Sequence, residues 1–138
     1  MHFYVVIVGL DFGSRRIGVA VSDDTGRAAY PLSIIERRSP KHDIQRLADL
    51  LGSRKPERLV VGLPLSMDGS EGPMARAARR FAAQLAARFQ IPVELFDERL
   101  TSFEARSRLV ELGQGRRSRV DAVAAAVILE GWLEAKAR

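Results

Sequence analysis

Hydrophobic positions in the first third of the chain fall into short runs that are separated by residues typical of turns. The runs cover residues 3–11, 17–22 and 29–36, with turn-forming residues at 12–16 and 23–26 between them. Short apolar runs bounded by turn residues predict β-strands, and short connections favour antiparallel pairing of consecutive strands. The first third is therefore predicted to form an antiparallel meander of three strands.

Beyond the meander, the hydrophobic pattern alternates between helical spacing and short continuous runs. Helical spacing over residues 44–51 and 73–89 predicts two helices. Continuous apolar runs at 58–63 and 91–98 predict the fourth and fifth strands. Strands connected through helices are expected to pair in parallel, because a helical crossover returns the chain to the same end of the sheet.

The last third of the chain is predicted to be helical. Thr101 and Glu104 fit a capping box for a helix that ends at Gly113, and residues 120–133 predict a further apolar helix that Asp121 opens. A meander followed by strand–helix units predicts an α/β fold, with a mixed five-stranded sheet and helices on both faces. A chain of 138 residues is expected to form one such domain, spanning residues 1–138.

Composition restricts the class of protein and the partners. There are no cysteines, which excludes disulfides and thiolate metal sites and is typical of a reducing cytosol. We expect a soluble cytoplasmic protein, because the chain shows neither a signal-peptide pattern nor an apolar run near the roughly 18 residues that span a bilayer. The formal net charge of +5 is carried mainly by arginine, which binds phosphate well and favours nucleic-acid contact. The alternative explanation of this composition is that arginine simply replaces lysine throughout the chain.

Three carboxylates lie where packing alone explains them poorly. Asp11 and Glu98 end apolar runs that read as strands, and Asp121 opens an apolar helix. An ionised acid at the edge of an apolar core is costly unless it is paired, hydrogen-bonded or bound to a metal. Ligand sites of such sheets gather at the carboxyl ends of parallel strands. Because Mg²⁺ and Mn²⁺ prefer carboxylate oxygens, the set predicts a two-metal site that hydrolyses phosphodiesters.

Each of these acids also has a purely structural explanation. Asp121 suits the N-cap of a helix, Glu98 suits an ion pair with Arg99, and Asp11 suits a turn. Adjacent strand residues point to opposite faces, so only one of Asp97 and Glu98 is expected to face Asp11. Periodicity alone does not decide which of the two it is.

Four segments resemble the motifs of the YqgF/RuvX family of bacterial RNase H-like nucleases, in order and over nearly the whole chain. They are residues 11–20, 60–72, 97–102 and 120–125. The resemblance implies an RNase H-like fold and a hydrolase, a metal-dependent endonuclease that processes the 5′ end of pre-16S rRNA. It also implies that Asp11, Glu98 and Asp121 form the catalytic, metal-holding set. Asp97 is then expected to be structural, paired with an arginine.

The chain departs from the pattern of RuvC-type resolvases at one position of the site. Those resolvases carry a fourth acid one helical turn beyond the last one, where this chain has Ala124 and Ala125. Glu130 lies about half a revolution away from the Asp121 face of the helix, so it does not substitute for the missing acid. A three-acid site is therefore expected.

Other functions remain open at this point. The family is also described as a Holliday-junction resolvase acting on branched DNA, which would need a symmetric dimer, whereas an rRNA-processing enzyme can act as a monomer. A non-catalytic RNA- or ribosome-binding module is a second alternative. A phosphoryl-transfer enzyme of the actin/Hsp70/sugar-kinase type is disfavoured, because that architecture needs two such domains.

Substrate contacts are predicted around the acidic set. The loop of residues 64–72 follows a strand end, and arginines occur in the first hairpin, on the second helix, after the fifth strand and before the last helix. Each is also explained as a solvated face or a flexible connection. The expected partners are a structured rRNA precursor or branched DNA, and ribosomal particles. The candidate substrate-binding residues are Arg15, Arg16, Ser66, Arg76, Arg80, Arg99, Arg116 and Arg117.

Overall fold

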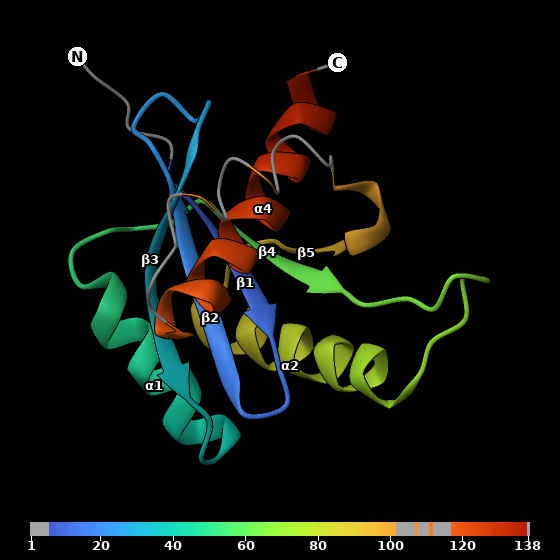
Figure 1. Cartoon of the computed structure of the whole chain (residues 1–138). Coiled ribbons are helices and arrows are strands. Elements are labelled where there is room, and N and C mark those ends of the chain that lie inside the picture. The colour runs from blue at the N-terminus through green and yellow to red at the C-terminus, as the bar shows by residue number, and fades with distance from the viewer. Residues whose placement is uncertain (1–5, 102–106, 108–110, 112–116, 138) are drawn as a thin grey trace.

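The structure is a computed structural model and describes residues 6–101, 107, 111 and 117–137 (Figure 1). Its strands are β1 (Ile7–Phe12), β2 (Arg16–Ser22), β3 (Ala29–Glu36), β4 (Arg58–Leu63) and β5 (Val93–Asp97). The described helices are α1 (Pro40–Leu51), α2 (Pro73–Phe89), the short 3₁₀ turn η1 (Glu98–Leu100) and α4 (Arg117–Ala137).

The strands form one mixed sheet of order β3-β2-β1-β4-β5. The first three strands pair antiparallel, while β4 pairs parallel with β1 and β5 pairs parallel with β4. The carboxyl ends of β1, β4 and β5 therefore lie at the same edge of the sheet. The predicted mixed five-stranded sheet, with its meander followed by parallel strands, is confirmed.

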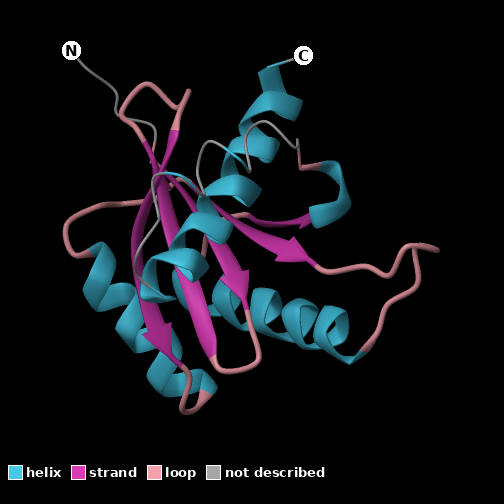
Figure 2. Cartoon of the chain, in the orientation of Figure 1, coloured by secondary structure: helices cyan, strands magenta, loops and turns pink. Residues whose placement is uncertain are grey.

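Helices cover both faces of this sheet, as Figure 2 shows, with α4 on one side and α1 and α2 on the other. Strand residues alternate between the two layers because successive side chains point to opposite faces. Leu10 and Val61 pack toward Leu47 of α1 and Leu85 of α2 in one buried cluster. In the other, sheet residues Ile7, Ala20 and Val60 pack with α4, through Val123, Ile128, Leu129 and others.

Helix α4 lies unusually close to the middle of the sheet because a glycine faces it. A Cβ atom on Gly9 of β1 would lie 2.7 Å from Cβ of Leu129 and 3.0 Å from the carbonyl oxygen of Ala125. Real Cβ atoms essentially never approach other atoms within 3.0 Å. The absence of a side chain at Gly9 is therefore what lets the backbone of α4 rest on β1.

No helix in the described ranges is long and apolar enough to cross a membrane.

The structure corrects the two predicted boundaries that concern the acids. Helix α4 begins at Arg117 rather than at Asp121, so the explanation of Asp121 as an N-cap is wrong. Strand β5 ends at Asp97, and Glu98 begins the η1 turn rather than ending the strand. The capping box that involves Glu104, and the helix predicted to follow it, fall outside the described residues.

Candidate active site

The carboxyl end of β1 brings Asp11 to the face of the sheet that α4 covers. Asp11 lies within β1 and pairs with Gly18 of β2, so it is not a turn residue. A Cβ atom on Gly18 would overlap the carbonyl oxygen of Asp121 and lie 2.5 Å from its carbonyl carbon. Because Gly18 has no side chain, the backbone of α4 meets β2 at Asp121, directly beside the strand position that Asp11 occupies.

The two aspartates are close enough to affect each other's charge. Burial, and then the negative charge of Asp121, raise the pKa of Asp11 from 3.8 to about 6. Ionised Asp11 is therefore poorly compensated by its surroundings, which is the electrostatic condition that favours a bound cation. The pair confirms that the first strand and the last helix converge, although 110 positions separate them in the chain.

Asp121 has a cationic partner. Nε of Arg16, at the start of β2, donates a hydrogen bond of 2.6 Å to Oδ2 of Asp121. Both side chains are partly exposed, by 36% for Arg16 and 28% for Asp121, so water screens this ion pair only in part. Sequence reasoning assigned Arg16 to substrate and missed this contact, because nothing local links residues so far apart.

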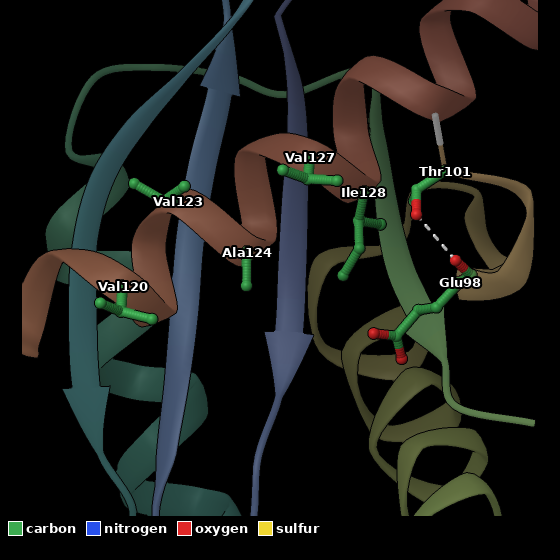
Figure 3. Close-up of a pocket in the computed structure, with 7 residues that line it drawn as sticks. All are labelled: Glu98, Thr101, Val120, Val123, Ala124, Val127 and Ile128. Carbon is green, nitrogen blue, oxygen red and sulfur yellow. Dashed lines mark hydrogen bonds between the residues drawn. The ribbon is translucent and has the colours of Figure 1, made fainter. Parts of the chain in front are cut away.

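Glu98 comes to the same face of the sheet from the other side of β4. Strand alternation turns Phe96 toward α4, and the chain continues into η1, where Glu98 extends over β4 beneath α4 (Figure 3). A Cβ atom on Gly62 would lie 3.1 Å from both Cγ and Cδ of Glu98. Gly62 therefore leaves the space that the side chain of Glu98 occupies. The hydroxyl Oγ1 of Thr101 donates a hydrogen bond of 2.9 Å to the carbonyl oxygen of Glu98.

A mostly apolar pocket of about 200 Å³ continues from Glu98 along α4 (Figure 3). Ala124 lines this pocket and is one of the two alanines found where the pattern of RuvC-type resolvases has a fourth acid. The wall of the pocket at this point is hydrocarbon, so it offers no further ligand oxygen. The other lining residues are Thr101, Val120, Val123, Val127 and Ile128.

The donor set suits a hard divalent cation in its chemistry, because Asp11, Asp121 and Glu98 offer carboxylate oxygens. The positions of these three side chains form only part of a metal site. Asp11 and Asp121 form a close pair and Glu98 shares their face, but no three His, Cys, Asp or Glu side chains within residues 6–101 and 117–137 are grouped tightly enough to hold one ion. Asp11, Glu98 and Asp121 are thus arranged around one edge of the sheet without forming a closed cage.

Comparisons with known proteins show the family to which the chain belongs. The sequence profile of the RuvX family, described as "Holliday junction resolvase", matches residues 5–135. The chain belongs to the RuvX family. A relative from Anaeromyxobacter sp. (strain Fw109-5), named "Putative pre-16S rRNA nuclease", is 53% identical over 132 residues, or 94% of this chain and 96% of the relative. A relative of the same name from Chloroflexus aggregans (strain MD-66 / DSM 9485) is 47% identical over 133 residues, or 94% of each.

Solved structures confirm the RNase H-like fold of this RuvX-family chain. RuvC of T. thermophilus, in complex with a Holliday junction substrate, matches with a TM-score of 0.64 at 15% identity, covering 96% of this chain and 97% of RuvC. The resolvase of fowlpox virus, in complex with Holliday junction DNA, matches with a TM-score of 0.61 at 11% identity, covering 97% and 100%. At such low identities the likeness concerns the fold alone.

Asp97 forms the expected ion pair with an arginine. It accepts hydrogen bonds from Nε and Nη2 of Arg99, the latter at 2.8 Å, which holds the pKa of Asp97 below its usual range. Nη1 of Arg99 also reaches the carbonyl oxygen of Met67 at 3.3 Å. Arg99 therefore connects the end of β5 to the loop of residues 64–72, which extends away from the sheet (Figure 1).

The loop is further ordered by its own hydrogen bonds. Ser66 N donates to Ser70 O and Gly69 N donates to Ser66 O, and Asp68 accepts from both the backbone and the hydroxyl of Ser70. Met67 is 93% exposed at this fixed loop, a feature that the sequence did not suggest. Ser66 therefore lies next to Met67, the loop residue that Arg99 connects to the end of β5.

Three of the other predicted substrate contacts lie on the surface. Arg15 is exposed in the turn after β1, and Arg76 and Arg80 are exposed on α2. Arg80 borders a small hollow that also includes Phe12, the residue after Asp11. Arg116 lies outside the described residues, and Arg117 is described only as the first residue of α4.

Proposed function

We propose that this chain is a divalent-metal-dependent endonuclease that processes the 5′ end of pre-16S rRNA, as a single cytoplasmic domain. The observation that carries the proposal is the pair Asp11–Asp121, in which burial and mutual repulsion leave Asp11 with a pKa of about 6 at the carboxyl end of β1. Support for the substrate comes from the relatives named "Putative pre-16S rRNA nuclease", which match over nearly the whole chain.

Asp11, Glu98 and Asp121 would hold Mg²⁺ or Mn²⁺ through their carboxylate oxygens. A bound ion of this kind supplies an activated water and neutralises charge on the phosphodiester. The carboxylates would orient the ion at the sheet edge, where Gly18 leaves room for the backbone of α4 at Asp121 and Gly62 leaves room for the side chain of Glu98. No side chain is proposed as a nucleophile.

Substrate binding is assigned to the arginines that the sequence predicts as substrate contacts, of which Arg15, Arg76, Arg80 and Arg99 are exposed. Arginine donates paired hydrogen bonds to phosphate. Arg15 lies in the turn after β1, and Arg80 borders the hollow that includes Phe12, the residue after Asp11. The loop carrying Ser66 would lie along the substrate, fixed by Arg99. Binding of this kind depends on phosphate charge and weakens with salt. The arginines assigned here are Arg15, Arg76, Arg80, Arg99, Arg116 and Arg117.

The test is Mn²⁺-dependent cleavage of a pre-16S rRNA 5′ leader and of a four-way DNA junction, by wild type and by Asp121→Asn. Asp24→Asn is a matched control, because it removes one carboxylate charge from an exposed turn. We expect cleavage of the RNA by wild type and by Asp24→Asn, and none by Asp121→Asn. Cleavage retained in Asp121→Asn would refute the acidic site.

Holliday-junction resolution is the second candidate, favoured by the description of the matching family. It predicts cleavage of the DNA junction but not of the RNA leader, by a symmetric dimer that cuts two strands. If neither substrate is cleaved and both are bound in a salt-sensitive manner, a non-catalytic RNA- or ribosome-binding module becomes the better description.

A further inference from the structure

We propose that Met67 contacts an unstacked base of the substrate, so that the loop of residues 64–72 selects nucleic acid in which base pairing is interrupted. The inference rests on the proposed function and deepens it by naming the structural class of the substrate. Its basis is the 93% exposure of Met67, in a loop whose backbone is held in place by hydrogen bonds.

Hydrogen bonds within the loop form a turn around Met67. The backbone N–H of Ser66 donates 2.9 Å to the carbonyl oxygen of Ser70, and the N–H of Gly69 donates 2.8 Å to the carbonyl oxygen of Ser66. Gly69 has a φ of 87°, in the left-handed region that glycine adopts without strain. Asp68 accepts hydrogen bonds from the N–H and the hydroxyl of Ser70, at 2.9 and 2.6 Å. The turn therefore presents Met67 to solvent from a fixed backbone.

The carboxyl-terminal side of the loop is anchored to α2. Nε of Arg79 donates to both carboxylate oxygens of Glu71, at 2.7 and 2.9 Å. Nη1 of Arg76 donates 2.9 Å to the carbonyl oxygen of Glu71. These contacts are exposed and each contributes little alone, but together they restrict the motion of the chain between the turn and the helix.

Arg99 joins the same turn to the acidic site. Its Nη1 donates 3.3 Å to the carbonyl oxygen of Met67, and Arg99 is the residue that follows Glu98. The loop continues from the carboxyl end of β4, at the edge of the sheet where β1 carries Asp11. Met67 is therefore connected, through one arginine side chain, to the segment that carries Glu98.

The chemistry of this turn fits a nucleobase better than a protein surface. Methionine is flexible and polarizable, and apolar side chains of this kind insert against bases whose stacking is disrupted. The exposed neighbours of Met67 in the turn are polar residues and a glycine, so its apolar area is that of one side chain, whereas a stable protein interface buries some 20–30 residues on each side. The exposed Arg99 and Arg76 suit the phosphates that flank a base.

Selection follows from the cost of exposing a base. Taking a base out of its stack costs least where it is already unpaired. A contact with Met67 is therefore more favourable at a branch, a bulge or the end of a paired segment than within a continuous duplex. A structured RNA precursor and a branched DNA both contain such points, so the two substrates share the chemistry that Met67 would recognise.

The experiment measures binding of the whole chain to nucleic acid that carries the fluorescent base 2-aminopurine, in EDTA so that no metal-dependent cleavage occurs. The probes are an RNA hairpin with a single-stranded 5′ leader and a four-way DNA junction, each labelled beside the point where pairing ends. A fully paired duplex of each kind is the control probe. The variants are Met67→Ala, Met67→Leu and the control Tyr30→Ala, which removes a side chain that is 52% exposed on β3.

Wild type is expected to raise the fluorescence of a probe with interrupted pairing, because 2-aminopurine brightens when it leaves the stack. Met67→Ala should bind that probe about ten-fold more weakly and without the rise, since the apolar contact is lost, but should bind the duplexes as wild type does. The salt dependence of binding should not change, because no charge is removed. Met67→Leu should keep most of the affinity and Tyr30→Ala all of it. The probe that brightens distinguishes RNA from DNA.

The outcomes separate this inference from the proposed function. If Met67→Ala binds the interrupted probes as wild type does, the inference is overturned and a protein becomes the better occupant of the loop. An equal loss of affinity for the duplexes, or binding by wild type without a rise in fluorescence, also overturns it.

A rise that depends on Met67, without cleavage of either substrate in Mn²⁺, would leave the inference standing while the proposed catalysis fails. Binding of no probe by wild type would contradict both. Unfolding curves of all variants, followed by the fluorescence of Trp132, verify that each is folded.

Discussion

Gly18→Ala is expected to separate the two aspartates by pushing α4 away from the sheet. The added Cβ would lie 2.5 Å from the carbonyl carbon of Asp121 and overlap its oxygen, although real Cβ atoms essentially never come within 3.0 Å. Both contacting atoms belong to backbone, so no rotamer change relieves the overlap. The helix must lift, and Gly9, on which α4 also rests through Ala125 and Leu129, restricts how it can tilt.

The expected loss of stability is about 2–4 kcal/mol. Inserting a methyl group into a well-packed interior costs about 1–3 kcal/mol, and lifting α4 also loosens the buried cluster that it forms with Ile7, Ala20 and Val60. The sign is informative, because alanine inside a strand is normally favoured over glycine by about 0.5–1 kcal/mol. If Gly18 were only a strand residue, the variant would be more stable than wild type.

The assay is urea unfolding followed by the fluorescence of Trp132, which is the chain's single tryptophan and is buried in α4. Gly72→Ala is the control, because a Cβ there meets nothing within 4 Å, and it should change stability by less than about 1 kcal/mol. A second readout is the pKa of Asp11 by NMR, which should fall below about 6, because lifting α4 makes Asp11 less buried and moves Asp121 away. A variant at least as stable as wild type, with the pKa of Asp11 unchanged, would refute the reasoning.

Three further outcomes are expected. The folded state raises the pKa of Asp11 to about 6, so ionisation of Asp11 lowers the stability of the protein as the pH rises from 3.8 through 6. Asp11→Asn should therefore stabilise the protein by up to about 3 kcal/mol at pH 7.5 and make no difference at pH 3. Urea unfolding at the two pH values checks this. Glu94→Gln removes an ion pair of 2.8 Å with Arg58 and should lower stability by about 1 kcal/mol at pH 7. Because the pKa of Glu94 is lowered in the folded state, the difference in stability between the two proteins should shrink as the pH falls below the usual pKa of 4.5. A difference that does not change with pH would show that the charge of Glu94 does not stabilise the fold. Arg99→Gln should leave thermal stability nearly unchanged, since the side chain of Arg99 is exposed and water screens its ion pair in part, but it should speed hydrogen exchange in residues 64–72. Equal exchange in both proteins would show that Arg99 does not order the loop.

Local pattern in the sequence was enough to predict the strands, the helices α1 and α2, and the mixed sheet. Alternation and helical spacing record which positions face a buried layer, and the turns between them are short. The same signal misplaced the start of α4, because its apolar pattern begins near residue 120 while the helix begins at Arg117. The first turn lacks that apolar repeat, so periodicity did not reveal it.

The sequence by itself also marked Asp11, Glu98 and Asp121 as unusual, since each acid lies at the edge of an apolar segment, and the resemblance of its motifs identified the family. Only the tertiary structure decided that Asp11 and Asp121 form a pair, that Glu98 shares their face, and that Arg16 binds Asp121. These relations depend on strand register and on where α4 crosses the sheet. Register and crossing are set by contacts between distant residues, such as the glycine that lets α4 rest on β2, and local periodicity carries no information about them.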